Sequence, residues 1–266
     1  ESRGVSGLDL CGNGVVVVPG ELFVSRTGNP NQYPAGRRIR NVYQGASSLV
    51  ARVFLARPAY ESVQAVMDEI IRRGGAVALS TVSKVLKMLD EDLVIRRAGR
   101  TSELLQADEL LDRLADAYKP PAIRARRKYR WTGDSGDILA MLRQSSGQLV
   151  LTGAGSVDRY AVMPREKTIQ CYCGSIVEIE EKLKGQLEES PRFPDLDLIE
   201  TDDPTVFFDS RIDSHLNSQT DAGIAIASPT QCWIELQAGD KRQRDAAVQV
   251  RKRIVDELRG GERGRR

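Results

Sequence analysis

Several residue types that define common protein classes are scarce in this chain. Aromatic residues make up 5% of its 266 residues, so any core must consist mainly of aliphatic side chains. No stretch approaches the ~20 apolar residues that a membrane-spanning helix needs, and no charged and then apolar leader opens the sequence. These absences exclude an integral membrane protein and a secretory precursor as first interpretations, and we expect no membrane partner.

Cysteine and histidine are also scarce. The 4 cysteines include no C-x-x-C pair, and one C-x-C with a single histidine cannot supply four zinc ligands. We therefore expect neither a metal nor another cofactor. Thiols at these spacings fit the reducing environment of the cytoplasm better than a disulfide scaffold, so the sequence predicts a cytoplasmic protein.

Charge of one sign does not dominate the chain either. The 39 Lys and Arg residues are nearly balanced by 37 Asp and Glu residues, which gives a net charge of +2 with the histidine neutral. Only the distribution of charge along the chain is informative about partners. That distribution, with the hydrophobic periodicity, predicts an α+β protein in five parts: a β-rich leader (1–44), helices with a hairpin (45–118), a basic linker (119–135), a mixed α/β domain (136–259) and a disordered tail (260–266).

The leader contains a hairpin signal. Residues 15–18 and 21–24 are apolar runs of strand length, and they flank the turn dipeptide Pro19-Gly20.

Helical periodicity begins after residue 45. We expect three helices in succession: one on the stripe Leu49, Val50, Val53 and Phe54; one that ends at Gly74-Gly75; and one with Ser80 as its N-cap and Val82, Val85, Leu86 and Leu89 buried. A β-hairpin with a cationic tip follows over residues 93–105, and then a fourth helix that ends before Pro120-Pro121.

Three helices followed by a two-stranded hairpin is the order of a winged helix-turn-helix. Its third helix would enter a major groove, which is wide enough to admit a helix, and would present Thr81, Ser83, Lys84 and Lys87 to base edges and phosphates. The hairpin tip would contact the DNA backbone through Arg96, Arg97 and Arg100. A purely protein-binding adaptor with the same core remains an alternative.

The basic segment after Tyr118 contains no acidic residue up to Trp131. It could be a solvated linker, or it could contact nucleic acid through Arg124, Arg126, Arg127 and Lys128, since cations interleaved with aromatics suit single strands as well as duplex phosphates.

The remaining 136–259 segment alternates between element types. We expect helices at 138–142, 157–162 and 176–187, strands at 149–151, 168–173, 196–199, 206–208 and 224–226, a helix that starts at Ser228-Pro229, and a terminal helix on Ala247, Val250, Ile254 and Leu258. Trp233 is expected in the core, with Gln231 and Glu235 as a buried polar pair.

The order of several motifs resembles the AbiEi-like antitoxins of type IV toxin–antitoxin (abortive infection) systems. Residues 80–89, 93–94 and 96–100 resemble the winged-helix segment of that family, and 108–118 resembles the helix after it. Residues 151–153 and 226–236 resemble its C-terminal domain, with Glu235 where the family has Asp. Residues 4–13 look like the end of a nuclease-like domain that precedes the winged helix in longer members.

The resemblance implies a bacterial transcriptional repressor that binds double-stranded operator DNA and autoregulates its operon. It also implies a functional link to a cognate nucleotidyltransferase-like toxin, without catalysis by this chain.

The alternative is a nucleic-acid-modifying enzyme that a winged helix directs to its target. Gly155-Ser156 with Asp195 and Asp197 resembles part of a nucleotidyltransferase site, although the two parts are too far apart in sequence. A nuclease remnant is indicated by Asp9 and Glu21, but the expected lysine after Glu21 is missing. The single histidine, His215, lies in a polar segment and is expected to be a surface residue.

Overall fold

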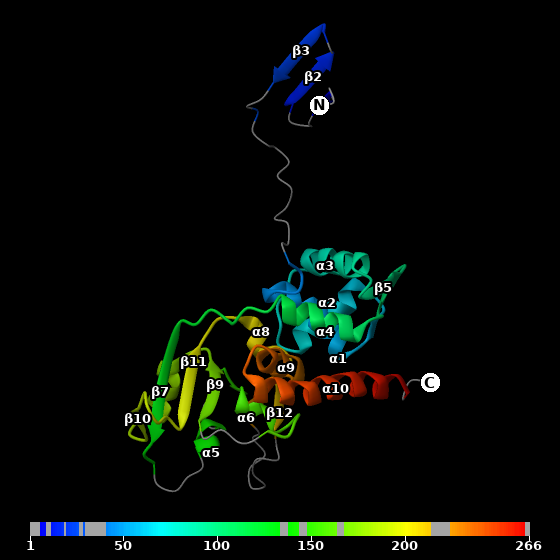
Figure 1. The fold of residues 1–266 in the computed structure, drawn as a ribbon. Helices are drawn as coiled ribbons and strands as arrows, with labels where there is room; N and C mark the ends of the chain where they lie inside the picture. Colours follow the sequence, from blue (N-terminus) through cyan, green and yellow to red (C-terminus); the bar gives the residue numbers. More distant parts are fainter. Residues whose placement is uncertain are drawn as a thin grey trace. The chain divides into compact units, whose positions relative to one another are not determined.

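Figure 1 shows the computed structural model, which describes residues 6–8, 12–18, 20–26, 29, 41–133, 138–143, 148–163, 168–213 and 224–263. The chain divides into two units, Glu1–Arg40 and Asn41–Arg266. The secondary structure is α+β, as the sequence predicts. The first boundary lies a few residues before the expected one at 44, while Asp9 and His215 lie outside the described residues.

The first unit contains a three-stranded sheet in the order β1-β2-β3. Its strands are β1 (Gly7–Leu8), β2 (Gly14–Val18) and β3 (Leu22–Arg26), with antiparallel pairing throughout. The predicted hairpin is confirmed, because Val18 pairs with Leu22 across the turn. Gly20 has a positive φ of 79°, a conformation that glycine adopts without steric cost.

The second unit opens with a helical layer and a small sheet. After a 3-10 turn (Gly45–Ser47), the elements are α1 (Ser48–Ala56), β4 (Ala59–Tyr60), α2 (Val63–Arg72), α3 (Leu79–Glu91), β5 (Ile95–Ala98), β6 (Thr101–Leu104) and α4 (Ala107–Asp116). The three predicted helices, the hairpin and the fourth helix are confirmed. The short strand β4 was not predicted, and it pairs with β6 to give the antiparallel order β4-β6-β5.

Hydrophobic periodicity accounts for this layer. Helix α1 is buried on all sides from Ser48 to Leu55, whereas α2, α3 and α4 each bury a single stripe. The start of α3 differs from the prediction: its N-cap is Ala78, whose carbonyl accepts from the Val82 N–H at 3.1 Å, so Ser80 lies within the first turn. A serine in the first turn and a serine at the N-cap give nearly the same sequence signal.

Two glycines form the turn between α2 and α3. Gly74 has a φ of 80°, in the left-handed region. Gly75 is buried, and a Cβ there would lie 2.7 Å from Ile70 Cγ2, 3.0 Å from Phe208 Cδ2 and 3.1 Å from Leu49 Cδ1. The turn therefore packs directly on the core, with no room for a side chain.

A seven-stranded mixed sheet forms the other half of this unit, in the order β10-β7-β11-β9-β8-β13-β12. The strands are β7 (Ala125–Trp131), β8 (Leu149–Thr152), β9 (Ile169–Cys173), β10 (Leu187–Glu189), β11 (Leu196–Glu200), β12 (Arg211–Asp213) and β13 (Ile224–Ile226). β11 runs parallel to β9 and β13 runs parallel to β8, while the other neighbours are antiparallel.

Six helices accompany this sheet among the described residues: α5 (Ile138–Arg143), α6 (Ala154–Val157), α7 (Ile176–Lys182), α8 (Pro204–Phe207), α9 (Pro229–Gln237) and α10 (Lys241–Arg263). Helix α9 begins where the sequence predicts. Ser228 is its N-cap and accepts from the Gln231 N–H at 3.1 Å, and Pro229 occupies the first turn. The inward stripe of α10 is also confirmed, because Ala247, Val250, Ile254 and Leu258 are buried.

Several predicted boundaries are wrong. Much of the expected linker is strand β7, which lies between β10 and β11. Val206 and Phe207 of the expected strand at 206–208 belong instead to α8, because Asp203 caps that helix and Pro204 starts it. The expected helices at 157–162 and 176–187 are the shorter α6 and α7. The tail is helical as far as Arg263, and residues 264–266 lie outside the described residues.

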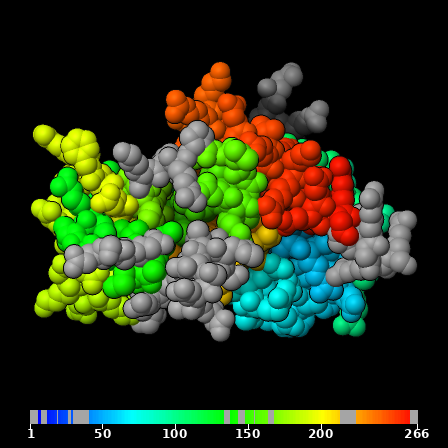
Figure 2. Space-filling model, turned by 90° about the horizontal axis from the view of Figure 1, so that it is seen from below, coloured from blue at the N-terminus to red at the C-terminus, as the bar shows by residue number. Residues whose placement is uncertain are grey.

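Residues 45–118 and 136–259, which the sequence assigns to separate parts, both belong to the compact unit Asn41–Arg266. Figure 2 shows the red residues of α10 lying against the blue and cyan residues of the helical layer. On α10, Arg251 forms ion pairs with Asp112 and, at 3.0 Å, with Asp108 of α4. The long terminal helix thus connects the two halves.

Candidate nucleic-acid interface

The outward face of α3 carries the residues that the sequence assigns to a DNA groove. Ser83, Lys84 and Lys87 are exposed and Thr81 is partly exposed. The predicted buried stripe is confirmed, because its four apolar residues (Val82, Val85, Leu86 and Leu89) are fully buried. The hydrophobic spacing therefore identifies the solvent-facing side of this helix correctly.

The N-terminus of α3 has free donor capacity. No described side chain caps it, and its first turn contains no acidic residue. The backbone N–H groups of a first helical turn have no intrahelical acceptor, and together with the helix dipole they favour an anion. The cationic side chains of α3 and its electropositive end therefore lie on the same element.

The two lysines of α3 differ in their surroundings. Among the described residues, no carboxylate forms an ion pair with Lys84. Lys87 Nζ lies 3.6 Å from Glu91 Oε1, and both side chains are more than half exposed. An exposed pair of this kind contributes only ~0.2–1 kcal/mol and can be exchanged for another anion.

Acidic residues gather at the opposite end of α3, where other groups hold two of them. Asp90 accepts from the Arg97 backbone N–H at 2.9 Å. Asp92 accepts from the Tyr43 hydroxyl at 2.6 Å and lies 3.0 Å from Arg113 Nη1. Burial of Tyr43, together with its hydrogen bond to Asp92, raises the pKa of its phenol, so it remains a donor. The two cationic side chains of α3 therefore lie in its middle turns, between the uncapped N-terminus and the acidic end.

The β5–β6 hairpin places its arginines differently from the prediction. Only Arg100 lies at the turn, next to Gly99 with a φ of 62°. Arg96 and Arg97 lie on β5, opposite Glu103 and Ser102. Arg96 Nη2 is 2.7 Å from Glu103 Oε2, an exposed cross-strand ion pair. The hairpin tip therefore carries one arginine rather than the predicted three.

The predicted cations of residues 124–128 lie at and along β7, and most of them are paired. Arg124 contacts Glu200 at 2.9 Å and Asp202 at 2.8 Å. Arg126 binds both carboxylate oxygens of the buried Asp197 at 2.9 and 2.6 Å. These acids come from β11 and the loop after it, which are distant in sequence. The segment therefore looks basic in sequence, although these arginines form ion pairs in the structure.

Arg127 has a partner on α7. Its Nη1 lies 2.6 Å from Glu180 Oε1, which also accepts from the Tyr129 hydroxyl. Burial raises the pKa of Glu180, but the hydrogen bonds from Tyr129 and Arg127 outweigh it and leave the pKa below its usual range. Among the described residues, Lys128 alone of the four predicted cations here has no ion pair.

The two predicted sets of site residues are not brought together. In Figure 1, α3 lies in the helical layer at the top of the second unit, and β7 lies near the left edge of the seven-stranded sheet.

The groups considered for catalysis are engaged in local structure. The hydroxyl of buried Ser156 donates to the Gly153 carbonyl at 3.0 Å. Asp195 accepts from the Trp131 backbone N–H at 2.9 Å, and both oxygens of Asp197 bind Arg126. Within the described ranges, no group of His, Cys, Asp and Glu side chains is arranged to hold a metal ion.

The expected polar pair on α9 belongs to a longer hydrogen-bonded chain. Gln231 Nε2 donates to Glu235 Oε1 at 2.7 Å, and Glu235 also accepts from the Thr152 hydroxyl on β8. Gln231 Oε1 in turn accepts from Arg52 Nη1 on α1 at 2.7 Å. Burial raises the pKa of Glu235, and the hydrogen bonds from Thr152, Gln231 and Tyr172 oppose that shift.

Arg52 was not singled out from the sequence. It is 5% exposed and lies in a helix whose other residues are nearly all apolar. A single arginine inside such an apolar helix could have indicated a buried polar site, since charged side chains are almost never fully buried unless they are paired. Trp233 is fully buried, as predicted.

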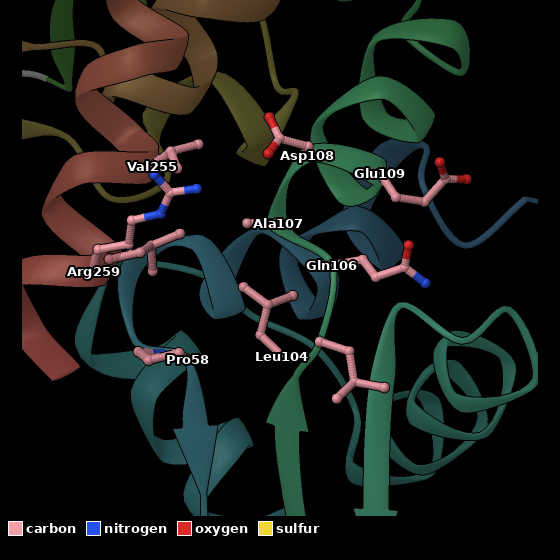
Figure 3. Close-up of a pocket in the computed structure, with 10 residues that line it drawn as sticks. Pro58, Leu104, Gln106, Ala107, Asp108, Glu109, Val255 and Arg259 are labelled. Carbon is pink, nitrogen blue, oxygen red and sulfur yellow. The ribbon is translucent and has the colours of Figure 1, made fainter.

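Figure 3 shows one cavity beside the helical layer, of about 390 Å³, where Leu104 and Asp108 lie opposite Val255 and Arg259 of α10. A second, of about 220 Å³, lies between α1, the end of α4 and the start of α8, and Arg52 forms part of its wall. Neither cavity touches the exposed face of α3.

Comparison of the chain with protein-family models, curated proteins and solved structures gave no match in any of the three. Among the described residues, no helix is both long and apolar enough to cross a bilayer.

Proposed function

We propose that residues 45–118 are a winged helix-turn-helix that binds double-stranded DNA, and that the protein is a transcriptional repressor of the AbiEi-like antitoxin kind. The order α1, β4, α2, α3, β5, β6 and the sheet order β4-β6-β5 support this assignment. The order is that of three helices followed by a hairpin, with the third helix available for a groove.

The observation that carries the proposal is the outward face of α3. Thr81, Ser83, Lys84 and Lys87 occupy it, its N-terminus is uncapped, and its buried side is entirely apolar. Hydroxyl and ammonium donors at this position suit base edges and phosphates in a major groove about 12 Å wide.

The hairpin supplies a second set of contacts. Arg100 at the turn and the partly exposed Arg97 on β5 have no ion pair within the described part of the chain. Contacts from these side chains to phosphate would set orientation and affinity without reading sequence. Arg96 would first have to exchange Glu103 for phosphate.

The biological setting follows from the resemblance of residues 80–100, 108–118, 151–153 and 226–236 to AbiEi-like antitoxins. We propose autoregulation of the operon and a functional link to a nucleotidyltransferase-like toxin. A reading frame for such a toxin next to this gene would support the setting, and repression of the operon promoter by this chain would test it.

The DNA-binding proposal is tested by fluorescence anisotropy with duplex DNA from upstream of the gene. We expect Lys84→Ala/Lys87→Ala to weaken binding by about tenfold per lysine at low salt, since a charge-assisted hydrogen bond contributes ~1.5 kcal/mol. The slope of log K against log salt should fall in magnitude by about two, because two phosphate contacts are lost.

The matched control is Lys184→Ala/Lys241→Ala, which removes two exposed lysines from the loop after α7 and from the start of α10. We expect it to leave affinity within twofold of the unaltered chain. Equal weakening by both pairs would indicate nonspecific charge attraction and would count against the assignment of α3.

A further inference from the structure

The second cavity, between α1, α4 and α8, has a buried cation in its wall. Its volume is about 220 Å³, which suits a ligand of a few non-hydrogen atoms. Arg52 is 5% exposed, and its guanidinium reaches Thr205 and Gln231 from α1. This cavity plays no part in the DNA contacts proposed above.

Arg52 is held by neutral acceptors. Its Nη1 donates to the Thr205 carbonyl at 3.1 Å and to Gln231 Oε1 at 2.7 Å. No described carboxylate forms an ion pair with it, and its Nε–H has no hydrogen-bond partner among the described residues. A buried charge without direct compensation is costly, and so is a buried donor left unpaired.

The electrostatics of the guanidinium agree with this geometry. Burial lowers the pKa of Arg52 to about 10, and the nearby groups that oppose the shift are Asp203, Tyr118 and Glu235. Arg52 therefore remains charged at neutral pH. It is a cation whose loss of hydration is only partly offset by the protein.

The rest of the wall includes two potential donors and one acid. Lys119 and Tyr118 line the cavity beside Arg52, whereas the hydroxyl of Tyr43, also in the wall, already donates to Asp92. Asp203 is the single acidic residue of the wall, and its Oδ1 already accepts from the Thr205 N–H at 2.9 Å as the N-cap of α8. Its charge should weaken the binding of an anion without preventing it.

We propose that this cavity is a binding site for a small oxyanion, a phosphate or a carboxylate, held by Arg52 with Lys119 at its mouth. An oxygen at this position would accept from the guanidinium and would give the buried charge the counter-ion that the described chain does not supply. The proposal does not depend on DNA binding, which is measured separately in chloride.

The test compares thermal unfolding of the full chain in inorganic phosphate, in acetate and in chloride at equal ionic strength. We expect phosphate or acetate to raise the unfolding midpoint by about 3 °C at a concentration tenfold above its Kd. A response to phosphate alone would identify the ligand class as phosphate, and a response to acetate would extend it to carboxylates. No response to either anion would overturn the proposal.

Two pairs of variants locate the effect. Arg52→Gln should abolish the shift, whereas Arg57→Gln should retain it. Arg57 likewise has an Nε without a partner among the described residues, but it stacks on Tyr60 at 5.2 Å and does not line the cavity. Lys119→Gln should reduce the shift, with Lys184→Gln as its matched control. An unchanged shift in folded Arg52→Gln would overturn the site.

Amide chemical shifts of the unaltered chain keep the proposal testable if Arg52→Gln does not fold. Phosphate should perturb the backbone amides of residues 43–45, 118–119, 203 and 205, which line the cavity. Perturbations confined to α3 or β7 would place the anion on the surface cations instead and would contradict the proposal.

Discussion

Lys84 on α3 and Arg126 on β7 are both exposed cations in segments rich in positive charge, yet their surroundings differ. Lys84 has no ion-pair partner among the described residues. Arg126 binds both oxygens of Asp197, a carboxylate that is only 5% exposed. The first cation is available to a ligand, while the second compensates a buried charge within the protein.

The comparison shows that a run of like charge in sequence does not identify a charged surface. The segment 119–131 is the more basic of the two in sequence, but three of its arginines (Arg124, Arg126 and Arg127) meet acids from β11, the loop after it and α7. The lysines of α3 are fewer, and among the described residues the one ion pair that they form is between Lys87 and Glu91 at the end of the same helix. The difference can be tested by separating effects on stability from effects on DNA affinity.

The largest expected effect is on stability, from Arg126→Ala. Removal of the guanidinium leaves Asp197 buried without its partner, and we expect a loss of ~2 kcal/mol in the free energy of unfolding, less than for a fully buried pair because Arg126 is partly exposed. Urea unfolding followed by circular dichroism measures it. DNA affinity should stay within twofold. The lysines of α3 should behave in the opposite way, since their replacement should weaken DNA binding and leave stability nearly unchanged.

The control for this variant is Lys128→Ala, because Lys128 lies on the same strand and forms no ion pair with any residue that the structure describes. Its stability should change by less than ~0.5 kcal/mol. A large loss of DNA affinity in either variant, at a temperature where the chain is folded, would show that β7 contacts DNA and that the two sets of cations act together.

A smaller effect on stability is expected from Glu180→Gln, and its size should depend on pH. The pKa of Glu180 in the folded chain is below its usual value, so its contribution to stability is present above pH ~4.3 and is lost as the pH falls through the lowered pKa. The variant should lack this contribution, which we expect to be under ~1 kcal/mol for a partly exposed pair.

The measurement is the difference in unfolding free energy between the unaltered chain and Glu180→Gln at pH 7 and at pH 3. The difference should shrink at the lower pH. A constant difference would mean that Arg127 and Tyr129 do not depend on the ionised carboxylate.

The smallest effect is expected from Glu91→Gln, which releases Lys87. Loss of an exposed pair and of a negative charge at the end of α3 should tighten DNA binding about twofold, or ~0.4 kcal/mol. Anisotropy at low salt would detect it, with Glu188→Gln on β10 as the control. An unchanged affinity would indicate that this end of α3 faces away from DNA, and weaker binding would contradict the expected repulsion between Glu91 and phosphate.

Local patterns were sufficient for much of the fold. The stripe on α3 was predicted by spacing alone, and the start of α9 by Ser228 and Pro229, because both signals come from neighbouring residues. Strand β7 was missed because its cations are compensated by residues ~50–80 positions away, which no local window includes.

Two other sequence predictions were wrong for different reasons. Val206 and Phe207 have side chains that are common in strands, which is why the sequence predicts a strand. They are helical because the N-cap at Asp203 starts a helix, and its effect outweighs their β-propensity. For the candidate site, spacing identified the exposed side of α3, whereas the position of Arg96 and Arg97 on β5 depended on the register of the hairpin, which a turn pattern predicts poorly.

The close packing at Gly75 has a consequence for engineering. Because Phe208 touches the turn that precedes α3, a fragment ending at Tyr118 would expose the underside of that turn to water. Grafting residues 45–118 onto another protein should therefore give a poorly ordered product. Changes of target preference are better sought by exchanging single side chains at positions 81, 83, 84 and 87 within the intact chain.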